Sequence, residues 1–182
     1  MELIDLKLTG ALERTVLSDT DAPDTPESQY TLNVTVVYQD RRTQEWAEHV
    51  CKRMGYLVGE ECLRCSWWPL VRLTEPEIFE DAVQAASVAD VIVVSLHVAE
   101  ELPEDLWTWI ALWLPRRRQP TGALVTLLDV TETPPSGASL TREYLRTVAS
   151  KGGLDFLPHE QELPVESLAE QTTPDRWWGI NE

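Results

Sequence analysis

A short apolar run at residues 90–97 constrains the fold of this chain more than any other feature of its sequence. The run reads Asp-Val-Ile-Val-Val-Ser-Leu-His, and segments with helical spacing of apolar residues stand on both sides of it. A continuous run of this length, rich in β-branched residues, is typical of a strand that is buried on both faces of a parallel sheet. We therefore predict that it is the central strand of an α/β domain.

Four further strands and four helices are predicted around this run. The strands are expected at 31–38, 61–68, 123–130 and 154–157, and the helices at about 41–54, 76–88, 102–113 and 139–151. Asp40 is placed to cap the first helix, which Gly55 would end. Thr74, Pro76 and Glu77 indicate a capping box at the second helix. The alternation predicts a parallel sheet with helices on both faces and the strand order 2-1-3-4-5.

The segment from Ala89 through Leu102 and Pro103 into a Trp-rich helix resembles the corresponding stretch of flavodoxins and related flavin reductases. The resemblance is one of pattern over residues 31–160, and it includes no diagnostic motif. It implies a flavodoxin-like, doubly wound, five-stranded fold. We assign this domain to residues 31–164, with an acidic N-terminal segment at 1–30 and a C-terminal tail at 165–182.

The chain carries a net charge of −16, and its ends hold most of that charge. Seven acidic and two basic residues lie within 1–30, and seven acidic residues and one basic residue lie within 154–182. Acidic surfaces repel phosphate backbones and anionic lipids, so nucleic-acid and membrane binding are disfavoured. The sequence has no bilayer-length apolar run and no signal peptide, which predicts a cytoplasmic protein.

The three cysteines are an odd number, which argues against a disulfide framework. Cys62 and Cys65 have C-x-x-C spacing, but residues three apart on a strand point to opposite faces. No second C-x-x-C or histidine pair completes a zinc site. We expect structural cysteines and no metal.

Polar residues gather where the first, third and fourth predicted strands end. The candidate ligand-binding residues are Asp40, Arg41, Arg42, Thr43, Ser95, His97 and Asp129, with Gln39 and Thr131 beside them. Ligands of flavodoxin-like sheets bind outside the carboxyl ends of the strands, near the point where the strand order reverses. These side chains are therefore expected to share one edge of the sheet.

Three kinds of site compete for this edge. An FMN phosphate would have to be held by Arg41, Arg42 and Thr43, although the turn has no glycine and Asp40 would repel a phosphate. The receiver domains of two-component signalling have the same fold, but Ser95 and His97 stand where that family has its phosphoacceptor aspartate, and no lysine follows the fifth strand. Nucleophilic catalysis by Ser95 and His97 would lack the G-x-S-x-G turn that exposes a nucleophile.

The helix at 102–113 has more apolar positions than one sheet contact requires. Trp107, Ile110 and Leu114 form a second stripe, which predicts a homodimer or protein-partner interface. The leading prediction is a non-catalytic, receiver-like regulatory or interaction module without a cofactor. The alternative is an FMN- or nucleotide-binding oxidoreductase with its site at the ends of the first and third strands.

Overall fold

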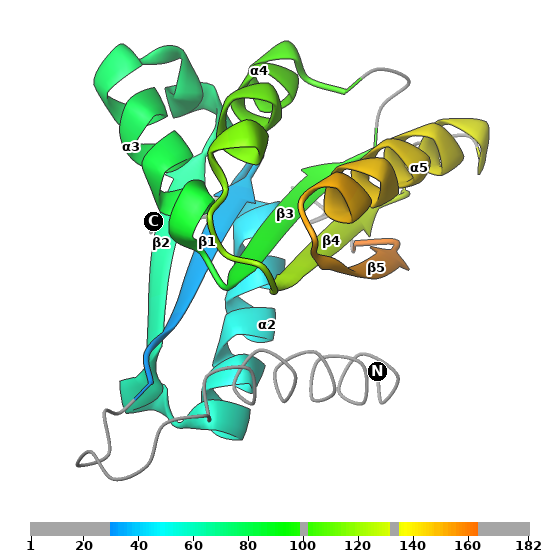
Figure 1. Cartoon of the computed structure of the whole chain (residues 1–182). Helices are drawn as coiled ribbons and strands as arrows, with labels where there is room; N and C mark the ends of the chain where they lie inside the picture. Colours follow the sequence, from blue (N-terminus) through cyan, green and yellow to red (C-terminus); the bar gives the residue numbers. More distant parts are fainter. Residues whose placement is uncertain (1–29, 99–101, 132–134, 164–182) are drawn as a thin grey trace, which may run out of the picture.

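Five parallel strands form one sheet in the order β2-β1-β3-β4-β5 (Figure 1). The computed structural model describes residues 30–98, 102–131 and 135–163. The strands are β1 (Leu32–Tyr38), β2 (Leu63–Pro69), β3 (Val91–His97), β4 (Ala123–Asp129) and β5 (Asp155–Gln161). The predicted strand order is confirmed, and the domain has the flavodoxin-like arrangement. Of the proposed N-terminal segment at 1–30 only Tyr30 is described, and the proposed tail at 165–182 lies outside the described residues.

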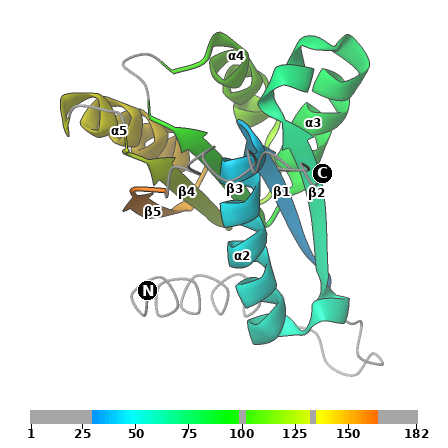
Figure 2. The ribbon, with the colours of Figure 1, turned by 180° about the vertical axis from the view of Figure 1, so that it is seen from behind.

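Helices cover both faces of the sheet. The helices are α2 (Arg41–Val58), α3 (Pro76–Val88), α4 (Glu104–Trp113) and α5 (Pro135–Lys151), with 3-10 turns η1 (Glu60–Cys62), η2 (Leu70–Thr74) and η3 (Leu114–Arg116). Figures 1 and 2 show α2 on one face and the other three helices on the opposite face. Two separate hydrophobic clusters fill the spaces between the helices and the sheet.

The central strand β3 contributes side chains to both clusters. Ile92, Val94 and Leu96 lie in the cluster beneath α3, α4 and α5. Val91 and Val93 lie in the cluster beneath α2. This alternation follows from the period of two of an extended chain, and all five side chains are buried. The prediction of a strand buried on both faces is confirmed.

Helix α2 begins where the sequence predicts and ends later. The Asp40 carboxylate accepts a hydrogen bond from the Thr43 amide at 3.0 Å, and the Asp40 amide donates to the Thr43 hydroxyl at 2.9 Å. These reciprocal bonds satisfy amides that the first turn leaves without helical partners. The helix runs through Gly55 and ends at Gly59, whose φ of 95° favours glycine.

The predicted capping box at α3 is wrong. The Thr74 hydroxyl donates to the carbonyl of Val71, and Glu75 stands at the cap position without a side-chain capping bond. The Glu75 carboxylate instead accepts from the Arg72 guanidinium at 3.0 Å. The residues before Pro76 form the turn η2, and this turn places Thr74 one residue too early to cap the helix.

The arginine run after α4 serves a role beyond ending the helix. The Arg117 guanidinium donates to the carbonyl oxygens of Ala89 at 2.8 Å, Thr121 at 2.8 Å and Gly152 at 3.2 Å. These carbonyls precede β3, β4 and β5. Gly122 lies so close that an added Cβ would come within 2.5 Å of this guanidinium. Arg117 therefore joins three segments at the edge of the sheet where these strands begin.

The apolar positions of α4 divide between the core and the surface. Ile110 is only 2% exposed and lies in the core, so it is not available on the surface of the monomer. Trp107 is 54% exposed, and Leu114 is half-buried. The second stripe predicted from the sequence is therefore split, because the buried face of α4 includes Ile110 together with Trp109 and Trp113 but leaves Trp107 outside. None of the described helices is both long and apolar enough to cross a membrane.

Candidate functional site

A cluster of polar side chains lies at the carboxyl ends of β1, β3 and β4. We define the strand-end cluster by six of the predicted residues: Asp40, Arg42, Thr43, Ser95, His97 and Asp129. Parallel pairing in register places His97 beside Asp129, and Tyr38 beside Ser95, so the turn after β1 meets the ends of the other two strands. The topology thus brings together residues that are far apart in the sequence.

The His97 ring bridges two carboxylates. Its Nδ1 lies 2.7 Å from an Asp129 oxygen, and its Nε2 lies 2.6 Å from an Asp40 oxygen. The main-chain amide of His97 donates to the Gln39 side-chain oxygen at 3.1 Å. Carboxylates only accept hydrogen bonds, so both ring contacts are hydrogen bonds when both ring nitrogens carry a proton. The ring is held in one orientation by the ends of three strands.

Asp129 is the buried carboxylate of the cluster, with an exposed side-chain fraction of 2%. One carboxylate oxygen accepts from the Thr131 amide and the Leu163 amide, both at 3.0 Å, and from the Thr131 hydroxyl. The other oxygen faces His97. Burial alone would raise the pKa of Asp129, but the bonds from Thr131, Leu163 and His97 outweigh it and hold the pKa below its ordinary value.

Asp40 closes the amino end of α2. Burial alone would raise its pKa, whereas bonds from Thr43 and the contact with His97 lower it further than burial raises it. The carboxylate is thus ionised at neutral pH while it accepts the bond from the Thr43 amide in the first turn of the helix. A helix start of this kind is the place where a flavodoxin-like fold would receive a ligand phosphate. Here that place is filled by the protein's own anion.

The two predicted arginines behave differently. The Arg42 guanidinium donates to the Leu163 carbonyl at 2.8 Å and lies 3.7 Å from the Asp129 carboxylate. Arg41 has a side chain that is 87% exposed, and it pairs with Glu45 one turn along α2. Only Arg42 belongs to the strand-end cluster.

Ser95 is fully buried, and its hydroxyl donates to the Thr43 carbonyl at 2.7 Å. Both ring nitrogens of His97 contact carboxylates. The arrangement in which His97 activates Ser95 as a nucleophile is therefore not formed. Ser95 instead secures the first turn of α2 to the end of β3.

Among the described residues, Leu163 takes part in the cluster although the sequence does not indicate it. Its amide and carbonyl bond to Asp129 and Arg42, but its side chain is apolar and has no part in these bonds. A main-chain contribution depends only on where the chain passes after β5. No side-chain pattern could have predicted it, whereas Gln39 and Thr131 flank the cluster as expected.

The order and parallel direction of the five strands define this protein as a flavodoxin-like α/β domain. No family model and no curated protein matches the sequence. A solved structure described as the Trp repressor binding protein from Bacillus subtilis is similar at a TM-score of 0.42 and 13% identity, covering 72% of this chain and 85% of that one. A similarity of this degree carries no argument about function.

Proposed function

We propose that this chain is a non-catalytic protein-interaction module of flavodoxin-like fold, in which the strand-end cluster holds the strand ends together. One observation carries the proposal. The Asp40 carboxylate accepts a hydrogen bond from the Thr43 amide in the first turn of α2 and also contacts His97, so an anion of the chain itself stands at the phosphate position of the fold. An incoming phosphate would meet this carboxylate and would have to break both contacts.

The groups that could compensate for Asp40 are already engaged. Arg42 bonds to the Leu163 carbonyl and lies near Asp129, and Arg41 pairs with Glu45. Both arginines of the turn therefore already have partners, and the phosphate of a mononucleotide would have to compete with these partners. This supports the proposal of a module without FMN.

The comparison with receiver domains also supports a non-catalytic module. His97 stands at the end of β3, where a receiver has its phosphoacceptor aspartate, and it is held between Asp40 and Asp129. Neither Asp40 nor Asp129 lies at the end of β3, and each carboxylate accepts several hydrogen bonds. The geometry supports a receiver-like shape without phosphotransfer to an aspartate.

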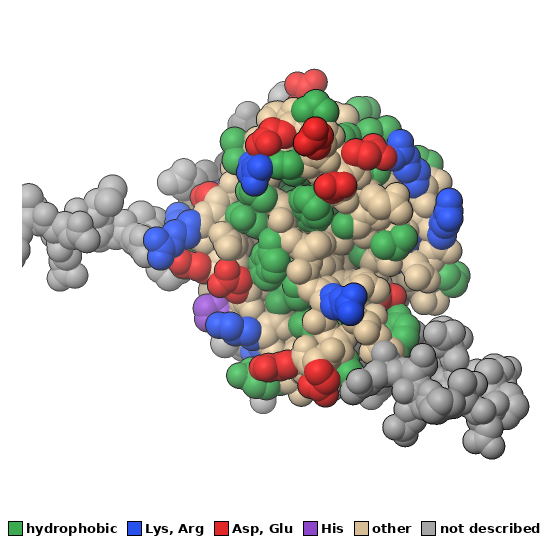
Figure 3. All heavy atoms as spheres, turned by 90° about the vertical axis from the view of Figure 1, so that its left-hand side faces the viewer, with side chains coloured by type: hydrophobic (Ala, Val, Ile, Leu, Met, Phe, Trp, Pro, Cys, Tyr) green, Lys and Arg blue, Asp and Glu red, His purple; other side chains and the backbone are tan. Residues whose placement is uncertain are grey.

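The partner surface that we propose lies on α4. Trp107, Ala111 and Leu114 follow one another at helical spacing, and the first two are exposed while Leu114 is half-buried. Large aromatic residues dominate the energetics of protein interfaces. Figure 3 shows the side of the molecule at the left of Figure 1, where hydrophobic side chains are interspersed with acidic ones and form no single patch. A second copy of the chain is the partner we propose.

Size-exclusion chromatography with light scattering tests this proposal. We expect the wild-type protein to elute as a dimer and Trp107→Glu to elute as a folded monomer, because the side chain is 54% exposed and the core of the monomer does not depend on it. The matched control is Tyr56→Glu on α2, where an aromatic side chain is 79% exposed away from α4. We expect this control to remain a dimer.

Two results would contradict the proposal. A wild-type protein that is monomeric at all concentrations would remove the homodimer, and equal dissociation of the Tyr56→Glu control would remove the assignment to α4. Titration with FMN, followed by its fluorescence, supplies the other test. Saturable quenching that disappears in Arg42→Ala would favour the flavin-binding alternative.

A further inference from the structure

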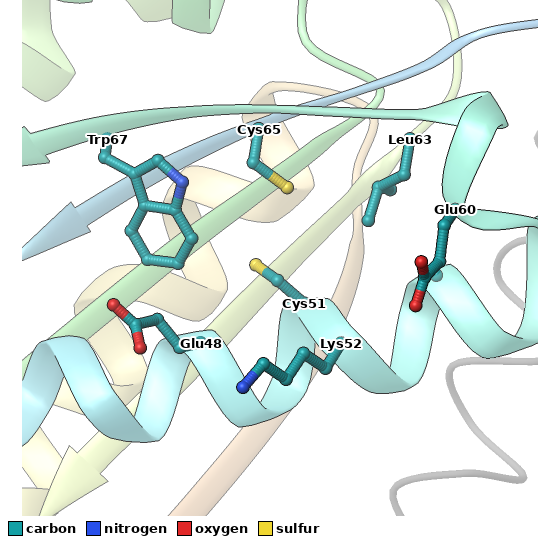
Figure 4. A pocket seen from close by; sticks show the side chains of 8 residues that line it. Glu48, Cys51, Lys52, Glu60, Leu63, Cys65 and Trp67 are labelled. Atoms are coloured by element: carbon teal, nitrogen blue, oxygen red, sulfur yellow. The ribbon is translucent and has the colours of Figure 1, made fainter.

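Two cysteines from different elements face one another in a groove between α2 and β2. Figure 4 shows the sulfur of Cys51 on the helix and the sulfur of Cys65 on the strand pointing toward each other. The groove has a volume of about 360 Å³, and Lys52, Glu60 and Trp67 also line it. The exposed side chains of Lys52 and Glu60 place it at the surface of the domain.

The thiols differ in their surroundings. Cys51 is buried and Cys65 is half-buried, so Cys65 is the more accessible of the two. A hydrogen bond between them lowers the pKa of Cys65, although burial opposes this effect. The same bond, together with burial and the nearby Glu48, raises the pKa of Cys51. A more acidic, accessible thiol beside a protonated one is the usual arrangement of an attacking and a resolving cysteine.

We propose that Cys51 and Cys65 are a redox pair that a hydroperoxide converts to a disulfide joining α2 to β2. The Cys65 thiolate attacks a peroxide oxygen, the O–O bond breaks, and the alcohol, or water from hydrogen peroxide, leaves. The Cys65 sulfenic acid then reacts with the Cys51 thiol, which forms the S–S bond and releases water. The two thiols lose two electrons, the hydroperoxide gains them, and a dithiol reductant reverses the change.

The third cysteine has a different place. Cys62 belongs to η1 and does not line the groove, although its spacing from Cys65 is the one that suggests a redox motif in the sequence. No group of three or more metal-binding side chains occurs within the described part of the chain, so two-cysteine oxidation fits the groove better than a metal. This inference goes beyond the proposed interaction module and does not depend on it.

Oxidation of the full-length protein by hydrogen peroxide tests the pair. After removal of reductant, we expect the intact mass to fall by two hydrogen atoms and non-reducing peptide mapping to join the peptides of Cys51 and Cys65. Cys62→Ser is the matched control and should form the same disulfide at the same rate. Cys65→Ser should consume peroxide at least about tenfold more slowly, since the accessible thiolate is lost.

The intermediate gives a second measurement. In Cys51→Ser we expect Cys65 to accumulate as a sulfenic acid that a dimedone probe labels, because no resolving thiol remains. Mapping of the wild-type protein needs no variant, so the test does not depend on how well the variants fold. A cross-link that includes Cys62, or three free thiols after excess peroxide, would overturn the inference.

Discussion

Asp129→Asn is expected to lower the free energy of unfolding by about 3 kcal/mol at neutral pH, in the range measured when one partner of a buried charged pair is removed. The asparagine oxygen can still accept from the Thr131 and Leu163 amides. Its NH₂ group, however, would face the Arg42 guanidinium, which only donates, and could bond to the His97 Nδ1 only if that nitrogen gave up its proton. The substitution therefore removes a charged acceptor and places donors against one another in a buried site.

Urea unfolding of the variant and the wild type measures this loss. The matched control is Asp81→Asn, which changes an exposed aspartate on α3 and should shift the free energy by no more than about 0.5 kcal/mol. Asp40→Ala, at a more exposed helix cap, should lose about 1 kcal/mol. A midpoint for Asp129→Asn that equals the one for the control would show that the carboxylate does not secure the strand ends.

The pH dependence of the Asp129 contribution follows from the direction of its pKa shift. The pKa is lower in the folded protein than in the unfolded chain, where it is about 3.9. The charged carboxylate therefore stabilises the fold above about pH 4, and this contribution disappears as the pH falls through the folded pKa. The difference between wild type and Asp129→Asn should be largest near neutral pH and should narrow below about pH 4. An unchanged difference at low pH would show that the effect is steric.

The fold could be predicted because its main determinants are local patterns. The β-branched run of β3 and the alternation of strands with helices leave few topologies open, and the observed strand order is the predicted one. The position of Asp40, Ser95, His97 and Asp129 at one edge follows directly from that order, since the carboxyl ends of parallel strands meet. What the order could not show is that His97 lies between two carboxylates.

The other details depend on contacts without a local signal. Cys51 and Cys65 meet because α2 packs on β2 with one face, whereas C-x-x-C spacing directs attention to Cys62. The incorrect capping box at Thr74 is a different kind of error. The motif is present in the sequence, but the turn η2 places Thr74 one residue before the cap position of the helix. Short motifs fail here when a tertiary contact or a neighbouring turn determines where the side chain lies.

Arg117 is the strongest case of a contact that depends on tertiary structure, and its loss should be among the most destabilising changes in the chain. Its three hydrogen bonds go to carbonyls of Ala89, Thr121 and Gly152, and charge-assisted bonds contribute about 1.5–3 kcal/mol each. Burial opposes this gain: it lowers the pKa of Arg117, although the charge of Asp90 acts in the other direction. The net loss in Arg117→Met is therefore expected to be about 3 kcal/mol, less than the sum of three bonds.

The neighbouring residue provides the control for this variant. Arg118 is exposed, so Arg118→Met removes the same charge and adds the same side chain with an expected change within about 0.5 kcal/mol. Arg117→Lys should recover only part of the loss, because one ammonium group cannot span three carbonyls that a planar guanidinium reaches together. Chemical denaturation of the three variants measures these differences. Equal midpoints for Arg117→Met and Arg118→Met would mean that water satisfies the three carbonyls as well as the Arg117 guanidinium does. The hydrophobic core alone would then align the starts of β3, β4 and β5.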